Sequence, residues 1–299
     1  MTNFARTFGQ DLMRGEHTVG GGQVNAVQKL APGGGGGGCW LGGPRTESSD
    51  KFATPAGLTM GEFNPDIDVP ASGTSIFDPV LTELLYRWFC PPEGLILDPF
   101  AGGSVRGIVA SVLGFQYIGH ELRAEQVAAN RMQAGTICPE NPPHWIEGDS
   151  ARTLRALPNL PADFLFSCPP YGDLEVYSDD PADLSAVPHD RFLELYADII
   201  AAGVDRLKPD RFAAFVVGDF RCKKGFYRNF VGATVAAFEA AGARFYNEAI
   251  LVTAVGSLPI RVGKQFKSGR KLGKTHQNIL VFIKGDPKRA AQACNGGDA

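Results

Sequence analysis

The chain has 299 residues, 44% of them hydrophobic, which is enough to bury one sizeable core with a further segment outside it. The formal net charge of −3 does not mark a general nucleic-acid-binding protein, so such binding has to come from local basic patches. No apolar run is long enough to span a membrane, the N-terminus lacks the apolar core of a secretion signal, and the six cysteines have no metal-ligand spacing. We therefore expect a cytoplasmic protein with reduced cysteines and with neither a membrane nor a metal as partner.

The first 74 residues differ in composition from the rest of the chain. They include six consecutive glycines at positions 33–38, with further glycine and proline close by. Such a stretch cannot bury enough apolar surface to offset the entropy lost on ordering. We predict a flexible arm over 1–74, with a short ordered piece near 63–69. The arm is either a plain disordered tail or a segment that contacts DNA or a partner.

From residue 75 onwards, hydrophobic periodicity predicts alternating helices and strands. In chain order these are a helix over 81–88, a strand over 94–97, a helix over 105–112, a strand over 117–119, a helix over 123–134, strands over 145–147 and 163–166, a helix over 192–200, a strand over 212–217, a helix over 226–241, and strands over 249–253 and 278–283. The alternation favours an α/β fold with a doubly wound, mostly parallel sheet. We place this domain at 75–287 and a tail at 288–299.

A glycine-rich motif, Asp98–Ser104 (DPFAGGS), joins the first predicted strand to the helix after it. Glycines let a backbone approach a ligand closely, and the carboxyl edge of a parallel sheet is where ligands bind. Taken alone, the motif fits a tight strand-to-helix turn equally well. Two acids follow later strands: Glu121 ends the next strand, where a carboxylate can accept hydrogen bonds from ribose hydroxyls, and Asp149 follows the third. These positions favour a nucleotide-like cofactor.

A second motif, Phe166–Tyr171 (FSCPPY), follows another buried strand about seventy residues later. Together the two motifs resemble the cofactor loop and the catalytic loop of the S-adenosylmethionine-dependent methyltransferases that modify exocyclic amino groups of DNA bases. The likeness runs from about Ser75 to Lys284, and it is to the compact enzymes of phages and prophages, which usually lack a partner nuclease. One departure is Ser104, where many relatives carry a further glycine.

This resemblance implies a Rossmann-like methyltransferase fold, S-adenosyl-L-methionine as cofactor and DNA as partner. The target is either adenine N6 or cytosine N4. Alternatives are methylation of RNA or of a protein amide, or a nucleic-acid-binding relative without turnover. The residues that the resemblance assigns to the cofactor are Phe77, Asp98, Pro99, Phe100, Gly102, Glu121 and Asp149.

For catalysis, the resemblance assigns Cys168, Pro169, Pro170 and Tyr171. In the family, the first side chain and the carbonyl of the first proline accept hydrogen bonds from the target amine, and the aromatic ring stacks on a base flipped out of the duplex. Cys168 departs from the Asp, Asn or Ser of the family, and sulfur is a weak acceptor. Either the Pro169 carbonyl carries more of the task, or Ser167 contributes. Cys168 precedes the prolines, unlike the nucleophile of cytosine-C5 enzymes, so we reject a covalent role.

A basic segment at 256–276 carries six cations and no acidic residue: Arg261, Lys264, Lys267, Arg270, Lys271 and Lys274. Its glycines predict a loop between two strands, suited to phosphate contacts. A smaller basic cluster lies at 221–228. Charge runs are usually solvated faces, but in a chain of net charge −3 this concentration favours DNA contact.

Overall fold

The computed structural model describes residues 77–157, 160–172, 183–253 and 258–296. The predicted arm at 1–74 lies outside these ranges. So do the last three residues of the predicted tail and the first two of the basic segment.

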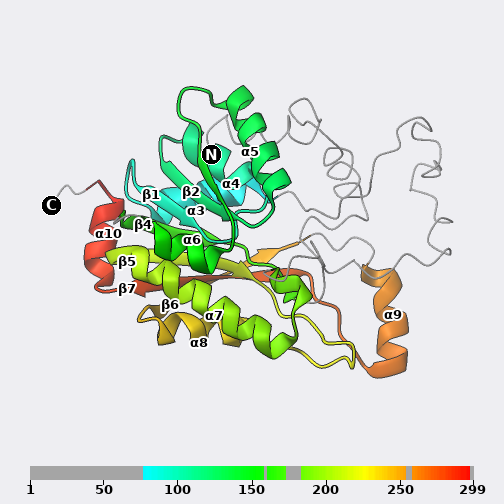
Figure 1. Cartoon of the computed structure of the whole chain (residues 1–299). Coiled ribbons are helices and arrows are strands. Elements are labelled where there is room, and N and C mark those ends of the chain that lie inside the picture. Colours follow the sequence, from blue (N-terminus) through cyan, green and yellow to red (C-terminus); the bar gives the residue numbers. More distant parts are fainter. Residues whose placement is uncertain (1–76, 158–159, 173–182, 254–257, 297–299) are drawn as a thin grey trace, which may run out of the picture.

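One seven-stranded sheet forms the centre of the molecule, with strand order β3-β2-β1-β4-β5-β7-β6 (Figure 1). Pairing is parallel among the first five strands, and β7 is antiparallel to both β5 and β6. This arrangement confirms the predicted doubly wound, mostly parallel, Rossmann-like fold. The strands are β1 Leu95–Asp98, β2 Gln116–Glu121, β3 His144–Glu147, β4 Ala162–Ser167, β5 Leu207–Val217, β6 Arg244–Val252 and β7 His276–Lys284.

Helices cover both faces of the sheet (Figure 1). One face packs against α3 Pro79–Phe89, α4 Val105–Val112, α5 Ala124–Ile137 and α10 Pro287–Cys294. The other packs against α6 Ser150–Ala156, α7 His189–Arg206 and α8 Phe230–Ala240, and a short 3₁₀ helix, η4, spans Leu184–Ala186. Side chains alternate along β4: Phe164 and Phe166 enter the first core and Leu165 the second. A strand buried on both faces explains the continuous apolar runs in the sequence.

Several segments differ from the sequence-based expectation. Strands β5 and β6 each begin five residues earlier than predicted. Residues 288–294 of the predicted tail belong to α10, which begins with an Asp286 cap followed by Pro287 and buries Ala290 completely. The basic segment contains a helix, α9 Leu258–Gly269, in place of a continuous loop. Helix α8 begins at Phe230, four residues later than expected, and α6 is an additional helix that the periodicity does not predict.

Candidate active site at the carboxyl edge of the sheet

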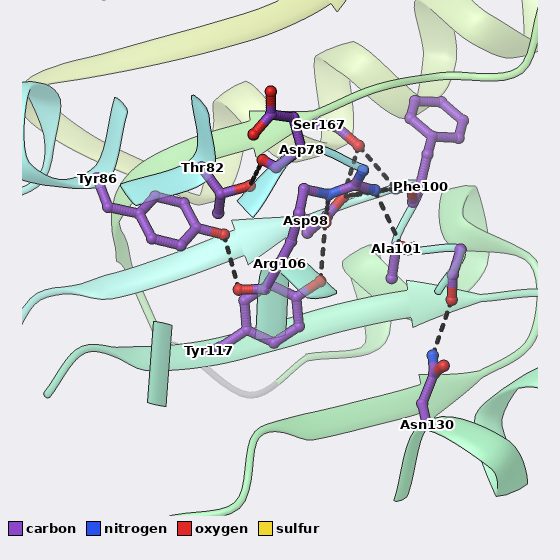
Figure 2. A network of polar contacts seen from close by, with 11 residues as sticks. Asp78, Thr82, Tyr86, Asp98, Phe100, Ala101, Arg106, Tyr117, Asn130 and Ser167 are labelled. Atoms are coloured by element: carbon purple, nitrogen blue, oxygen red, sulfur yellow. Dashed lines mark hydrogen bonds and ion pairs between the residues drawn. The ribbon is translucent and has the colours of Figure 1, made fainter. Parts of the chain in front are cut away.

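The two sequence motifs meet at one edge of the sheet. Strands β1 and β4 are parallel neighbours, with Leu97 opposite Leu165, so the loops that follow them start side by side. The Ser167 hydroxyl donates a hydrogen bond to Asp98 Oδ1 at 2.5 Å and accepts one from the Phe100 backbone N–H at 3.1 Å (Figure 2). Motifs 69 residues apart in the chain are thus bonded directly to each other.

Asp98 is the centre of a buried polar network. Its carboxylate is fully buried and accepts hydrogen bonds from Arg106 Nε at 2.6 Å and the Tyr117 hydroxyl at 2.8 Å (Figure 2). Burial disfavours the charged Arg106 guanidinium, yet the Asp98 carboxylate raises the pKa of Arg106 above its usual value. The Asp98 side chain therefore faces the protein interior. This corrects the expectation that it contacts a cofactor directly: it holds the glycine loop in place.

Arg106 is a functional candidate that the sequence reasoning missed. Its Nη2 donates to the carbonyl oxygens of Phe100 at 2.5 Å and Ala101 at 3.0 Å, so one guanidinium binds both the Asp98 carboxylate and the loop backbone. Phe77 lies against the same group, with its ring centroid 4.8 Å from the Arg106 guanidinium carbon. An arginine within an otherwise apolar helix face was the signal available in the sequence.

The glycine loop presents open backbone. Gly102 has a φ of 53°, a backbone conformation that residues other than glycine rarely adopt. A Cβ placed on Gly102 or Gly103 would meet no atom within 4 Å. Asn130 Nδ2 donates to the Gly102 carbonyl at 2.8 Å, and the Ala101 N–H donates to the His120 carbonyl at 2.9 Å. These hydrogen bonds hold the loop in place, and the space beside its two glycines is open. A ligand can therefore approach the loop backbone closely.

Two predicted cofactor residues, Pro99 and Phe100, are mostly enclosed. Pro99 is buried, and its carbonyl accepts a hydrogen bond from the Ser150 hydroxyl at 2.6 Å. The half-buried Phe100 ring packs against Tyr196 and Phe215, with centroids 5.8 and 6.3 Å away. These two side chains anchor the loop, and only Phe100 has surface left for a ligand.

The two predicted acids lie beside this loop. Glu121 ends β2, and one of its carboxylate oxygens accepts a hydrogen bond from the Arg123 N–H at 3.0 Å. Burial raises the pKa of Glu121, while hydrogen bonds from the backbone of Arg123 and Gly102 oppose that shift. Asp149 follows β3 and caps α6 by accepting from the Ala151 N–H at 2.9 Å. The fold thus brings Glu121 to the glycine loop, with Asp149 after the neighbouring strand.

The Pro-Pro loop is largely enclosed. Cys168 and Pro170 are half-buried and Pro169 is buried. The Ser167 hydroxyl is fully buried in the Asp98 network, so the expectation that Ser167 contributes as an acceptor for a target amine is wrong for this arrangement. The side chain that remains beside the Pro169 carbonyl is Cys168.

Tyr171 does not offer its ring to the surface. It is 3% exposed, and its hydroxyl accepts a hydrogen bond from Gln277 Nε2 at 2.6 Å. Its ring packs edge-on against Phe220 and also against Phe230, with centroids 5.9 and 5.8 Å away. The expected stacking of this ring on a flipped base does not fit this structure, because the ring is enclosed by its neighbours. Gln277 lies 106 residues after Tyr171 in the chain, so the sequence does not show that the two residues are in contact.

Helix α9, which forms most of the basic segment, lies away from the sheet (Figure 1). Lys264, Lys267 and Arg270 are exposed, whereas Lys271 and Lys274 are partly covered. Burial lowers the pKa of Lys274, opposed by the charge of Asp219. Arg261 lies within α9, but its side chain is outside the described part of the structure.

Within the described ranges, no helix is both long and apolar enough to cross a membrane. Likewise, no three His, Cys, Asp or Glu side chains there gather into a candidate metal site.

Comparisons with known proteins give structural neighbours only. No protein-family model and no curated protein matches the chain. A putative sarcosine dimethylglycine methyltransferase from Galdieria sulphuraria aligns with 69% of this chain and 84% of its own, at 14% identity and a TM-score of 0.47. Magnesium protoporphyrin IX methyltransferase from Synechocystis with bound SAM aligns with 69% and 79%, at 11% identity and a TM-score of 0.43. TrmN from Thermus thermophilus aligns with 70% of this chain, at 16% identity and a TM-score of 0.45, and this chain spans only 49% of that protein.

Proposed function

We propose that this protein transfers a methyl group from S-adenosylmethionine to an exocyclic amino group of a DNA base, either adenine N6 or cytosine N4. The observation that carries the proposal is the direct bonding of the glycine loop to the Pro-Pro loop through Ser167. One loop has open backbone suited to a cofactor, and the other has the residues that resemble an amine-binding loop. Their shared edge brings a donor and an acceptor within reach of each other.

The cofactor fits the residues around the glycine loop. The open backbone at Gly102 and Gly103 admits a ligand, and the Glu121 carboxylate is suited to the ribose hydroxyls. Asp149 is suited to the adenine, since the next residue, Ser150, donates a hydrogen bond to the carbonyl of Pro99 in the glycine loop. S-adenosylmethionine would supply an electrophilic methyl group on a sulfonium.

The protein would position the target amine with the Pro-Pro loop. The Pro169 carbonyl accepts a hydrogen bond from an amine N–H, which orients the nitrogen lone pair towards the methyl group. Cys168 adds a weak second acceptor. Prolines fix this loop and remove competing N–H donors. The contribution of these residues is mainly orientation, because direct in-line transfer needs no covalent intermediate.

Tyr171 has a different role in this scheme from the one expected. The hydrogen bond between its hydroxyl and Gln277 anchors the Pro-Pro loop, as does the packing of its ring against Phe220 and Phe230. Stacking on the target base then falls to a ring outside this loop. Phosphate contacts fall to the basic segment, whose exposed cations are Lys264, Lys267 and Arg270.

Methyl transfer from labelled S-adenosylmethionine to duplex DNA, followed by digestion to nucleosides, tests the proposal. We expect label in N6-methyldeoxyadenosine or in N4-methyldeoxycytidine. Label that enters RNA or protein but not DNA would replace the proposed substrate class. No label in any of the three, with cofactor binding intact, would indicate a nucleic-acid-binding relative without turnover.

A further inference from the structure

A short basic hairpin, residues 221–228, follows the carboxyl end of β5 and precedes α8. Arg221 and Tyr227 form an antiparallel bridge, and the Cys222 N–H donates to the Phe226 carbonyl at 2.8 Å. The turn closes with the Gly225 N–H on the Cys222 carbonyl at 2.8 Å, and Gly225 has a φ of 92°. The sequence pattern predicts that the end of this stretch leads into a helix. In the structure it forms a separate, hydrogen-bonded projection.

Two aromatic rings of this hairpin face outwards. Phe226 is 71% exposed and Tyr227 is 46% exposed. The Arg221 guanidinium carbon lies 3.8 Å from the centroid of the Tyr227 ring, and Arg221 Nη1 donates to the Gly225 carbonyl at 2.9 Å. The arginine therefore fixes Tyr227 and the turn together. Phe226 is left as an exposed ring on a constrained backbone, which costs little further entropy when it binds a ligand.

Positive charge surrounds these rings, and it comes from two separate parts of the chain. Lys223 and Lys224 are exposed on the turn. Lys271, from the segment after α9, reaches the same turn, since a Cβ placed on Gly225 would lie 2.6 Å from Lys271 Nζ. The two basic clusters of the sequence are thus neighbours on one surface.

The hairpin is attached next to the Pro-Pro loop. Its Arg228 N–H donates to the Phe220 carbonyl at 2.9 Å, and the buried Phe220 ring packs edge-on against Tyr171 at a centroid distance of 5.9 Å. Phe220 also lies close to Gly172, where a Cβ would be 3.7 Å from its ring. The candidate site and the base of the hairpin therefore share one packed aromatic cluster.

We propose that the basic hairpin is a nucleic-acid contact of this protein, in which Phe226 stacks on an unpaired base near the target while Lys223 and Lys224 hold phosphates. The inference rests on the proposed function, and it adds a stacking ring that the buried Tyr171 does not provide. Exposed aromatic rings among cations are the combination by which proteins bind single-stranded nucleic acid. The exposed Lys223 and Lys224, with Lys271 beside the same turn, favour a polyanion such as nucleic acid over an apolar protein surface.

The test is a fluorescence-anisotropy titration of a labelled single-stranded DNA oligonucleotide and of its duplex, with the full chain. Phe226→Ala should weaken binding to the single strand about 5- to 150-fold, the range for removal of one base stack, and Phe226→Trp should restore it. The salt dependence of binding should stay unchanged in Phe226→Ala. In contrast, replacing Lys223 and Lys224 with Gln should flatten it by about 0.7 log units for each phosphate of the single strand that the protein no longer neutralises.

Trp88→Ala is the matched control, because Trp88 is 57% exposed near the end of α3, away from the carboxyl edge of the sheet. It should bind DNA as the wild type does. If the wild type binds both DNA forms and Phe226→Ala binds equally well, the hairpin inference is wrong while the proposed function stands. If the wild type binds neither form, both proposals are overturned.

Discussion

The molecule uses charge in two opposite ways. At the Asp98 network, one carboxylate and one guanidinium are buried together, with side-chain exposures of 0% and 5%. On the basic segment and the basic hairpin, cations such as Lys223, Lys264 and Lys267 are exposed to water. Buried charges interact strongly but lose hydration, so they are stable only as a completed set. Exposed charges are screened and nearly independent, so each contributes little and their effects add.

The two regions have different tasks. The network fixes the geometry of the glycine loop and the Pro-Pro loop, because Ser167 and Arg106 each bind atoms of more than one residue there. The basic surface is suited to attract a polyanion without a fixed geometry. Disrupting the first should affect folding, and disrupting the second should affect binding alone.

The largest expected effect is that of Arg106→Met. It leaves the fully buried Asp98 carboxylate without its charge partner, and breaking a buried pair in this way costs about 3–5 kcal/mol of unfolding free energy. Arg155→Met is the matched control, since Arg155 pairs with Asp198 at side-chain exposures of 51% and 47%. Exposed pairs contribute about 0–1 kcal/mol. Urea denaturation of both variants measures the difference, and equal losses would remove the contrast between the two regions.

His120 is fully buried beside the network, with Nδ1 2.6 Å from the Thr153 hydroxyl, and it should make stability depend on pH. Burial lowers the pKa of His120 from 6.5 to about 4. The unfolded chain therefore binds a proton at a higher pH than the folded one. The contribution of the neutral His120 to the unfolding free energy is fully present above pH 6.5. It decreases by about 3 kcal/mol as the pH falls towards 4, at 1.36 kcal/mol per pH unit.

The measurement for His120 is the unfolding free energy of the wild type and of His120→Asn between pH 7 and pH 4. The variant should lose less stability over this range, whatever its stability at neutral pH, since the titrating ring is gone. Parallel pH profiles for the two proteins would mean that His120 is solvated in the folded state.

A third effect should appear at the proposed cofactor site. Glu121→Ala removes an acceptor expected to bind ribose hydroxyls, so it should weaken S-adenosylmethionine binding by about 1–3 kcal/mol, measured by calorimetry. Glu125→Ala is the control, because Glu125 lies four residues on with its side chain 73% exposed. Unchanged affinity in Glu121→Ala would remove this residue from the site.

The sequence is informative where one local pattern determines the structure. The apolar runs before Asp98 and Ser167 and the glycine loop between strand and helix identify the edge of the sheet where we propose the site. Pairings between distant residues are not readable in this way. The pairing of Asp98 with Arg106 and the capture of the Tyr171 hydroxyl by Gln277 depend on tertiary packing, and they reverse the expected direction of two side chains.

Local signals also conflict in places. In α9, Gly263 and Gly269 are poor helix formers and suggest a loop, but the helix forms over Leu258–Gly269. At the basic hairpin, Phe226 continues a helical pattern, although Gly225 with a φ of 92° turns the chain before α8 begins. The position of Asp149 suggests a cofactor ligand alone, yet this residue also caps α6.

A smaller effect per residue is expected on the exposed side of the comparison. Neutralising Lys264, Lys267 and Arg270 with Gln should weaken binding to unrelated duplex sequences alike and flatten the salt dependence by about 0.9 log units for each phosphate that the protein no longer neutralises. Stability should not change. Lys288→Gln, an exposed cation on α10, is the control. A triple variant with the wild-type salt slope would place DNA elsewhere on the protein.

The smallest effect is expected at Cys168, the half-buried residue next to the network. If its side chain only supplements the Pro169 carbonyl, Cys168→Ser should remain active at the wild-type rate or above it, because a hydroxyl is the better acceptor. Cys168→Ala should keep measurable activity, since the backbone acceptor stays. A covalent thiol nucleophile would instead make both variants inactive, and the wild type would form an adduct with a mechanism-based trap.

Methyl transfer by wild type and the two variants on one DNA substrate distinguishes these mechanisms. Because the Ser167 hydroxyl is committed to Asp98 and Phe100, it cannot take over as acceptor in either variant. Complete loss of activity in Cys168→Ser, with folding and cofactor binding intact, would therefore rule out the orientation mechanism.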